Sequence, residues 1–314
     1  MTRTEAPSNT ARTVLVTGAG GFVCSQVALD LAQAGFDVVA TDQSFDAPTA
    51  ARLANLRRIE APLASALAKD TSLRPFAVVH GAAITADPAS IGLSAAGHLR
   101  CNMDMLTHCL DWAQDAGAAR FVFLSSTGVF SADDGDQPLS ELSDASARGP
   151  YAAAKKAGEI VTQAAADARF ATLSLRLGNL FGPHETPRPT RPQVSLLAQM
   201  VSTARAGLIR LESPGNRRDW TWLPDIGRAT ATLLDDVPRA ATPVLHCGNT
   251  LACSDLELAT AICSHFPTAR IEIDAKPGRI KGPMASAVTS ALTGFDWTPL
   301  PSALSVLLSG GVAA

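Results

Sequence analysis

The feature that most constrains the fold is a glycine-rich turn between an apolar strand and a helix. Residues 13–25 read TVLVTGAGGFVCS, so a run of Val and Leu leads into Gly18, Gly20 and Gly21, and an amphipathic pattern begins at about Phe22. Glycines at such a turn let the backbone reach positive φ and approach a pyrophosphate without a Cβ in the way. The free N–H groups and the positive dipole end of the helix can then hold the phosphates.

An acidic residue, Asp42, ends the next apolar run, VVATD. The 24 positions from Gly18 to Asp42 fit one β-α-β unit. A carboxylate there accepts the ribose hydroxyls of adenosine and repels a 2′-phosphate. The next residues, Gln43 and Ser44, supply no arginine, so the pattern favours NAD over NADP. The alternative is an ordinary βαβ turn with a solvated aspartate, which would require the strand, the turn and the acid to coincide by chance.

Apolar, β-branched runs alternate with Ala-rich helical patterns over the first half of the chain. Strands are predicted at 13–17, 37–41, 76–80, 120–125 and 171–177, and helices at about 22–35, 93–117 and 151–168. This alternation is typical of a parallel sheet covered by helices on both faces. We therefore expect an α/β fold: a Rossmann-type doubly wound parallel sheet with a smaller, mixed α/β C-terminal substrate domain.

The rhythm changes after Leu177. Residues 182–193, GPHETPRPTRPQ, contain four prolines and cannot form regular structure. Beyond them we predict a helix at about 194–206, a strand–turn–strand around Pro214-Gly215-Asn216, a strand at 244–248 and two short helices within 254–314. The predicted dinucleotide domain is 1–177, with a return at about 218–250, and the predicted substrate domain is 178–217 and 251–314. Residues 1–11 and the final GGVAA are expected to be loose ends.

Composition excludes several classes of protein. The chain has 314 residues, 46% of them hydrophobic, and a formal net charge of −3. It can bury a core, but it has no basic field for nucleic acid or an anionic membrane. No apolar run approaches the roughly 20 residues that span a bilayer. The polar first 12 residues lack the apolar region of a secretory signal.

The cysteines and histidines point to a reducing compartment and to no metal. The six cysteines include no C-x-x-C pair, and the six histidines show no metal-ligand spacing with carboxylates. We therefore expect a cytoplasmic protein without a metal site.

The only tyrosine, Tyr151, lies four residues before Lys155. Residues four apart share one face of a helix, so both can act on one bound molecule. A free tyrosine has a pKa of about 10 and is a poor base at neutral pH. A neighbouring Lys⁺ and a cationic nicotinamide ring both favour the phenolate. The alternative is a surface tyrosine beside a solvated lysine.

A second polar group follows a buried strand, in FVFLSST at 121–127. Ligands of doubly wound sheets bind at the carboxyl ends of the strands. A hydroxyl of Ser125, Ser126 or Thr127 could therefore share a hydrogen bond with a substrate alcohol and with Tyr151. The alternative is a serine-rich turn.

Taken in order, these motifs resemble the short-chain dehydrogenase/reductase superfamily, in its extended branch of NAD-dependent sugar epimerases and dehydratases. The likeness runs from about residue 13 to 300. It includes TGAGGFV at 17–23, Asp42, HGAA at 80–83, Asn102, LSSTGVF at 124–130, YAAAK at 151–155, RLGNLFGP at 176–183 and RDWTWLPDIGRA at 218–229.

The resemblance implies a role for each matching residue. The family's catalytic hydroxyl lies three residues before a valine, and counting back from Val129 gives Ser126. Tyr151 would be the general base, and Lys155 would lower its pKa and bind ribose. The cofactor set implied is Gly18, Gly20, Gly21, Phe22, Val23, Asp42, Gly81, Ala82, Ala83, Asn102, Ser125, Tyr151 and Lys155. The substrate set is Ser126, Thr127, Asn179, Arg191 and Arg218, with Asn179 and Arg218 at the diphosphate of a nucleotide-sugar.

Two departures from the family pattern concern the cofactor. Cys24 replaces the third glycine, and the acid usually found near residue 61 is missing from IEAPLA.

Two further departures concern the substrate. Thr127 and Gly128 replace the acidic pair of the dehydratases, which argues against dehydration. The stretch 184–195 is unlike the usual nucleotide-sugar loop and supplies His184, Arg188, Arg191 and Ser195. These could grip a carboxylate or phosphate, or could belong to an exposed loop with solvated arginines.

The leading hypothesis is therefore an NAD-dependent enzyme that oxidises a carbohydrate hydroxyl, as a nucleotide-sugar epimerase. One alternative is net dehydrogenation of a free sugar or sugar acid with release of NADH. Another is a non-catalytic NAD-binding sensor, although such relatives usually lose the tyrosine or lysine. The Ala-rich helices at about 93–117 and 151–168 permit close packing, and the resemblance implies a homodimer through them.

Overall fold

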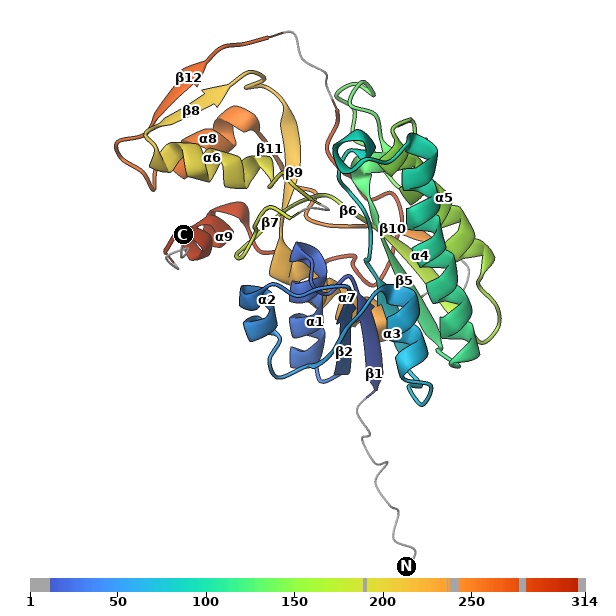
Figure 1. The fold of residues 1–314 in the computed structure, drawn as a ribbon. Helices are drawn as coiled ribbons and strands as arrows, with labels where there is room; N and C mark the ends of the chain where they lie inside the picture. Colours follow the sequence, from blue (N-terminus) through green and yellow to red (C-terminus); the bar gives the residue numbers. More distant parts are fainter. Residues whose placement is uncertain (1–11, 189–190, 236, 238–242, 277–280, 310–314) are drawn as a thin grey trace, which may run out of the picture.

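A seven-stranded parallel sheet forms the centre of the protein (Figure 1). The computed structural model describes residues 12–188, 191–235, 237, 243–276 and 281–309, so both predicted loose ends lie outside the described residues. The strand order is β10-β6-β5-β4-β1-β2-β3. From β1 the chain adds strands towards one edge of the sheet, and from β4 it adds them towards the other edge. The strands are β1 (Thr13–Thr17), β2 (Asp37–Asp42), β3 (Arg57–Glu60), β4 (Ala77–His80), β5 (Arg120–Ser126), β6 (Ala171–Leu177) and β10 (Val244–Cys247). The predicted doubly wound α/β fold is confirmed.

Alternating side chains of β1 explain why both faces of the sheet are covered. Val14 and Val16 pack into a core with α1 (Phe22–Gln33) and α7 (Leu223–Asp235). Leu15, between them, enters the opposite core, which α3 (Leu63–Lys69), α4 (Ala95–Asp115) and α5 (Pro150–Ala164) cover. Successive residues of a strand point to opposite faces, so a strand buried on both sides is apolar throughout.

Two smaller sheets lie apart from the large one. β9 (Arg217–Trp222) pairs in parallel with β7 (Asn179–Phe181) and antiparallel with β11 (Ala252–Ser254), while β8 (Leu208–Leu211) pairs with β12 (Arg270–Ile273). Three helices enclose their own apolar core with these strands: α6 (Leu196–Arg205), α8 (Asp255–Cys263) and α9 (Leu300–Ser309). In Figure 1, α6, α8, β8 and β12 gather at the upper left, away from α4 and α5. The smaller mixed part is thus confirmed, whereas the domain boundaries stay predictions.

Several elements were not predicted. The edge strand β3 reads RRIE and has no apolar alternation, and α2 (Ala47–Arg52) and α3 are short. Helix α7 follows β9 without a break, so no turn residue marks its start. The strand–turn–strand around residues 214–216 forms, but β8 and β9 join different sheets instead of pairing with each other.

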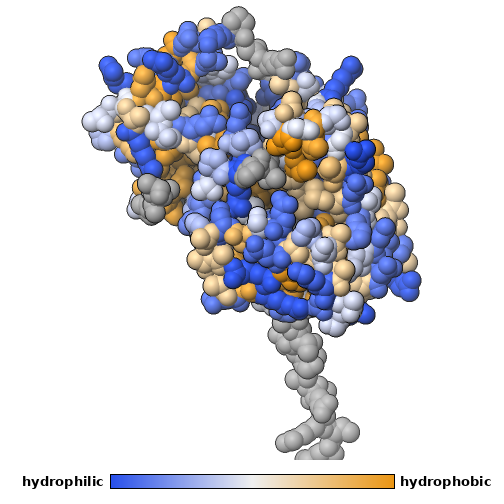
Figure 2. Space-filling view, viewed as in Figure 1, coloured by the Kyte–Doolittle hydropathy of each residue, from blue (hydrophilic) through white to orange (hydrophobic). Residues whose placement is uncertain are grey.

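Over the described residues, no helix combines the length and apolar character that crossing a bilayer requires. In the space-filling view, hydrophilic and hydrophobic residues are interspersed over the coloured part of the face (Figure 2).

Candidate active site

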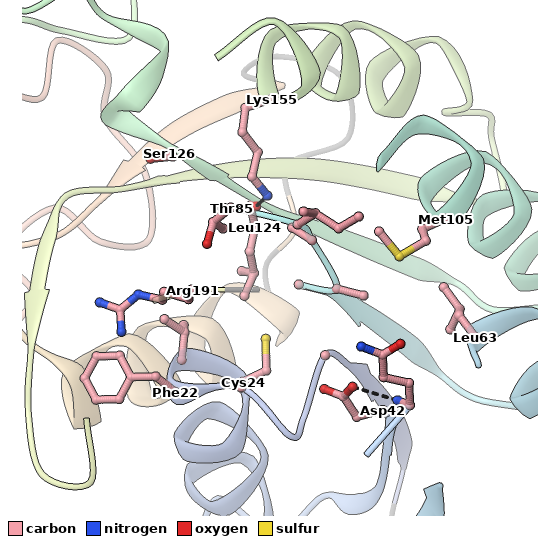
Figure 3. Close-up of a pocket in the computed structure, with 18 of the residues that line it drawn as sticks. Phe22, Cys24, Asp42, Leu63, Thr85, Met105, Leu124, Ser126, Lys155 and Arg191 are labelled. Atoms are coloured by element: carbon pink, nitrogen blue, oxygen red, sulfur yellow. Dashed lines mark hydrogen bonds between the residues drawn. The ribbon is translucent and has the colours of Figure 1, made fainter. Parts of the chain in front are cut away.

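A cavity of about 690 Å³ opens at the carboxyl ends of the central strands (Figure 3). The turn after β1, the ends of β2, β4 and β5, the first turns of α5 and the segment after β6 contribute to its wall. Thirteen predicted residues line it: Gly18, Gly21, Phe22, Val23, Asp42, Gly81, Ala82, Ala83, Ser125, Ser126, Tyr151, Lys155 and Arg191. The site therefore lies beside the reversal of strand order, where ligands of open α/β sheets bind.

The glycine turn has the shape that a dinucleotide needs. Gly18 adopts φ 74°, and a Cβ there would lie 2.7 Å from the backbone nitrogen of Ala82. A Cβ on Gly20 would lie 2.8 Å from Asp42 Oδ2, which instead accepts a 2.8 Å hydrogen bond from Gly20 N. Gly21 precedes α1 and offers no side-chain cap, so the N–H groups of the first helical turn remain available for phosphate oxygens.

Asp42 is held as a hydrogen-bond acceptor at the end of β2. Its Oδ1 accepts from Gln43 N at 2.6 Å and its Oδ2 accepts from Gly20 N. Burial raises the pKa of this carboxyl, while the backbone hydrogen bonds and the positive charge of Arg188 act against the rise. These backbone bonds hold the carboxylate in one orientation.

Apolar side chains line the far end of the cavity. Pro62 and Leu63 follow β3 where the family's acid is missing, and Met105 approaches from α4. Figure 3 places Leu63 and Met105 on the same side of the cavity as Asp42. This end can accept the flat face of an adenine without an acidic contact. Leu63 and Met105 were missed in the sequence, because each is an ordinary apolar residue in its local pattern.

Cys24 packs against Gly81. A Cβ on Gly81 would overlap with Cys24 Sγ, so the sulfur occupies space that only a glycine at position 81 leaves open. Burial raises the pKa of the Cys24 thiol to about 12, and the charge of Asp42 adds to the rise. The residue that replaces the third glycine is thus a neutral thiol that fills the contact between helix and sheet.

Tyr151, Lys155 and Ser126 meet on one wall. Gly149 and Pro150 begin α5, which puts Tyr151 in its first turn and Lys155 one turn later. Lys155 Nζ donates a 2.7 Å hydrogen bond to the carbonyl oxygen of Leu124, and burial lowers the pKa of this lysine to about 8. Burial raises the pKa of Tyr151, whereas a hydrogen bond from Ser126 and the positive charge of Arg191 lower it.

A buried ion pair fixes α5 to the sheet beneath this wall. Arg176 of β6 donates two 2.8 Å hydrogen bonds to Glu159, which lies one turn after Lys155. Ser125 Oγ donates to the same carboxylate at 2.6 Å. Glu159 and Arg176 were missed in the sequence, although Glu159 continues the four-residue spacing of Tyr151 and Lys155.

Comparison with known proteins places this geometry in a family. The model of the NAD dependent epimerase/dehydratase family matches residues 14–245. The chain belongs to this family. It is an NAD-dependent enzyme of the extended short-chain dehydrogenase/reductase type, and NAD is its cofactor.

Individual relatives cover almost the whole chain. The dTDP-4-dehydro-6-deoxy-D-allose reductase of Streptomyces bikiniensis is 28% identical over 86% of both chains. The structure of MoeE5 with UDP-glucose and NAD has a TM-score of 0.74 at 25% identity, covering 95% of this chain and 97% of its own. The UDP-glucose 4-epimerase of Thermotoga maritima, solved with UDP-glucose, shares the fold, with a TM-score of 0.78 at 21% identity and coverage of 95% and 97%.

In this epimerase/dehydratase family member, five predicted residues lie outside the cavity wall. They are Gly20, Asn102, Thr127, Asn179 and Arg218. Asn102 instead holds the loop after β4, because its Oδ1 accepts from Ile84 N at 2.9 Å. Arg218 forms a two-pronged ion pair with Asp255, at 2.8 and 3.2 Å.

Proposed function

We propose that this family member is a nucleotide-sugar epimerase in which Tyr151 is the general base. The observation that carries the proposal is the convergence of Tyr151, Ser126 and Lys155 on one wall of the NAD cavity. The names of the relatives support a sugar-nucleotide substrate, since they include a dTDP-sugar reductase and a complex with UDP-glucose.

The chemistry follows from the positions of these side chains. Bound NAD⁺ supplies an acceptor for the hydrogen, with its electron pair, on the carbon that bears the reacting hydroxyl. Tyr151 Oη takes the hydroxyl proton, and the O–H electron pair becomes the second bond of a carbonyl. Ser126 Oγ donates a hydrogen bond to the same oxygen. The charge of Lys155 favours the phenolate form of Tyr151, which makes it a usable base near neutral pH.

Inversion requires that the sequence of proton movements runs back. After the sugar has presented its opposite face, the hydrogen and its electron pair return to the same carbon while Tyr151 returns its proton to the carbonyl oxygen, so atoms and electrons balance without net oxidation. Thr127, Asn179 and Arg218 are proposed to hold the nucleotide-sugar, with the diphosphate at Asn179 and Arg218. Arg218 keeps 31% of its side chain exposed despite its ion pair, so a phosphate can reach it.

Dehydration is disfavoured by the space around Tyr151. A Cβ on Gly128 would lie 3.1 Å from Ser126 Oγ and 3.2 Å from Tyr151 Cε1. An acidic side chain at this position would push against both catalytic groups. The second acid of the pair that the resemblance associates with dehydratases would therefore crowd the catalytic wall.

The test is a screen of nucleotide-sugars and sugar acids with NAD⁺, following NADH absorbance and product stereochemistry together. An epimer without lasting NADH is the expected result. Release of stoichiometric NADH would contradict epimerisation and would indicate net dehydrogenation of a free sugar or sugar acid.

Two variants check the residue roles. Tyr151→Phe should lower kcat by about 10²- to 10⁴-fold, the usual worth of a general base, with NAD affinity preserved. Lys155→Met should also be impaired, whereas its neighbour Lys156, which is exposed, provides the matched control Lys156→Met. Full activity in Tyr151→Phe would remove the proposed base and would favour a non-catalytic role for the site.

The assembly and the compartment are also proposals. We expect a homodimer through α4 and α5, which pack side by side and expose Ile160. Light scattering would measure its mass, and a monomer at micromolar concentration would exclude it. A reducing cytoplasmic location agrees with six free cysteines.

A further inference from the structure

Arg191 is held in the cavity wall by a buried acid. Its Nη2 lies 2.5 Å from Glu185 Oε1, and the Glu185 side chain is only 3% exposed. Ser195 donates two further 2.7 Å hydrogen bonds to Glu185, from its backbone nitrogen and from Oγ. With three donors on one carboxylate, Glu185 fixes the direction of the guanidinium.

The ion pair with Glu185 leaves part of this guanidinium accessible. The Arg191 side chain lines the cavity and keeps 32% of its surface exposed. A guanidinium that is held in one orientation in a cavity wall is suited to bind an anion.

The position of Arg191 indicates which anion it can bind. Its guanidinium carbon lies 5.2 Å from the centre of the Phe22 ring, and Phe22 is the first residue of α1. Figure 3 shows Arg191 beside Phe22, away from Asp42 and Leu63. The guanidinium is thus close to the helix start whose N–H groups suit a pyrophosphate.

Arg188 extends the same arrangement towards the adenosine end. Arg188 and Arg191 exchange two 2.9 Å backbone hydrogen bonds. The Arg188 side chain donates to Asp46 at 2.7 Å and to Thr49 at 2.9 Å, and its charge acts on Asp42. Both arginines line the cavity; the charge of Arg188 acts on Asp42 at one end and the charge of Arg191 acts on Tyr151 at the other. The pair therefore spans the stretch between the ribose acid and the catalytic wall.

We propose that Arg191, oriented by Glu185, binds the pyrophosphate of NAD rather than the substrate. This revises the role that the sequence suggested for Arg191. The proposal rests on NAD binding and does not depend on the proposed reaction, so either can fail without the other.

The experiment is calorimetric titration of the cofactor-free protein with NAD. Arg191→Gln should weaken NAD binding by about 10- to 100-fold, the change that corresponds to one hydrogen bond between charged groups. Arg191→Lys keeps the charge but loses the planar fork, and Glu185→Gln loses the orienting charge, so both should fall between parent and Arg191→Gln. Arg217→Gln, an exposed arginine paired with Glu257 outside the cavity, is the matched control and should bind NAD like the parent.

A second titration distinguishes the pyrophosphate of NAD from the diphosphate of a nucleotide-sugar as the anion that Arg191 binds. UDP-glucose is added to the NAD-saturated proteins, and its affinity should be equal in parent and Arg191→Lys. NAD affinity that stays within two-fold of the parent in both Arg191 variants would overturn the proposal. A loss confined to UDP-glucose would also overturn it and would assign the guanidinium to the substrate. Circular dichroism of each variant confirms folding, and Arg191→Lys decides the matter if Arg191→Gln does not fold.

Discussion

The contact between Cys24 and Gly81 can be tested by adding a methyl group at position 81 and removing the sulfur at position 24, separately and together. A Cβ on Gly81 would lie under 3.0 Å from Cys24 Sγ, whereas nonbonded carbon contacts are optimal at about 3.5–4.0 Å. Gly81 has no positive φ, so an alanine there is strained only by this contact and by Leu124 Cδ1 at 3.1 Å. The sulfur or the start of α1 must therefore retreat by at least about 0.5 Å, and overpacking of this kind costs about 1–3 kcal/mol.

The reciprocal variant removes the sulfur. Cys24→Ala deletes one buried atom, which costs about 1 kcal/mol by analogy with a buried methyl group. If the effects were independent, the double variant would lose about 2–4 kcal/mol. The new methyl of Gly81→Ala instead enters the space that the sulfur leaves, and volume-conserving exchanges cost less than about 1.5 kcal/mol. We therefore expect a favourable coupling free energy of about 1–2 kcal/mol.

Urea unfolding of parent, both single variants and the double variant completes the cycle. Gly215→Ala serves as control, because a Cβ there meets nothing within 4 Å. Its stability should change by less than about 0.5 kcal/mol. NAD affinity, which the single variant Gly81→Ala should weaken, should recover in the double variant, since both positions line the cavity. Additivity within about 0.5 kcal/mol would refute the argument that these two residues share one space.

Substitutions at His80, Arg176 and Gly128 test three further contacts. Burial and, secondarily, the charge of Lys155 lower the pKa of His80 from 6.5 to about 3, so the unfolded state binds the extra proton between these values. The contribution of the neutral His80 to the free energy of unfolding is therefore fully present above pH 6.5 and is lost as the pH falls towards 3. In urea titrations over this range, the free energy of unfolding of His80→Gln should fall less steeply with pH than that of the parent. An unchanged dependence on pH would contradict the assignment. Arg176→Met should cost about 3–5 kcal/mol because Glu159 would remain buried and unpaired, and adding Glu159→Leu should recover most of the loss; equal stabilities of the single and double variants would argue against the pair. Gly128→Ala should lower kcat by about 10-fold or more by displacing Ser126 and Tyr151, with NAD affinity unchanged; a normal kcat would show that the catalytic wall tolerates the extra methyl.

Local sequence carries the information for the cofactor end of the site. The strand, the turn and the helix that follow one another at residues 13–33 form as predicted, and Asp42 meets Gly20 within a single β-α-β unit. Each contact there joins neighbouring elements, so spacing alone indicates it. The five core strands were predicted to within about one residue for the same reason, since both their faces are buried and their composition is unmistakable.

Contacts between segments that are distant in the chain could not be predicted from local spacing. Arg188 reaches Asp46 across 142 positions, and nothing in either local pattern indicates the pairing. The sequence identified 184–195 as unusual but could not decide between a ligand-binding loop and a solvated one. The structure brings Arg191 into the cavity wall because its acid, Glu185, lies within the same segment.

The same distinction explains why the reaction chemistry is easier to infer than the substrate. Tyr151 and Lys155 lie on α5 and Ser126 lies on β5, and the hydrogen bond from Ser125 to Glu159 joins this helix to this strand. The proposed substrate residues depend on Asp219, a buried acid of β9 that accepts hydrogen bonds from Asn179 N at 3.4 Å and Met284 N at 3.1 Å. These three segments are far apart in the chain, and any of them can change without moving the catalytic wall. Substrate choice can therefore vary within the fold while the chemistry is retained.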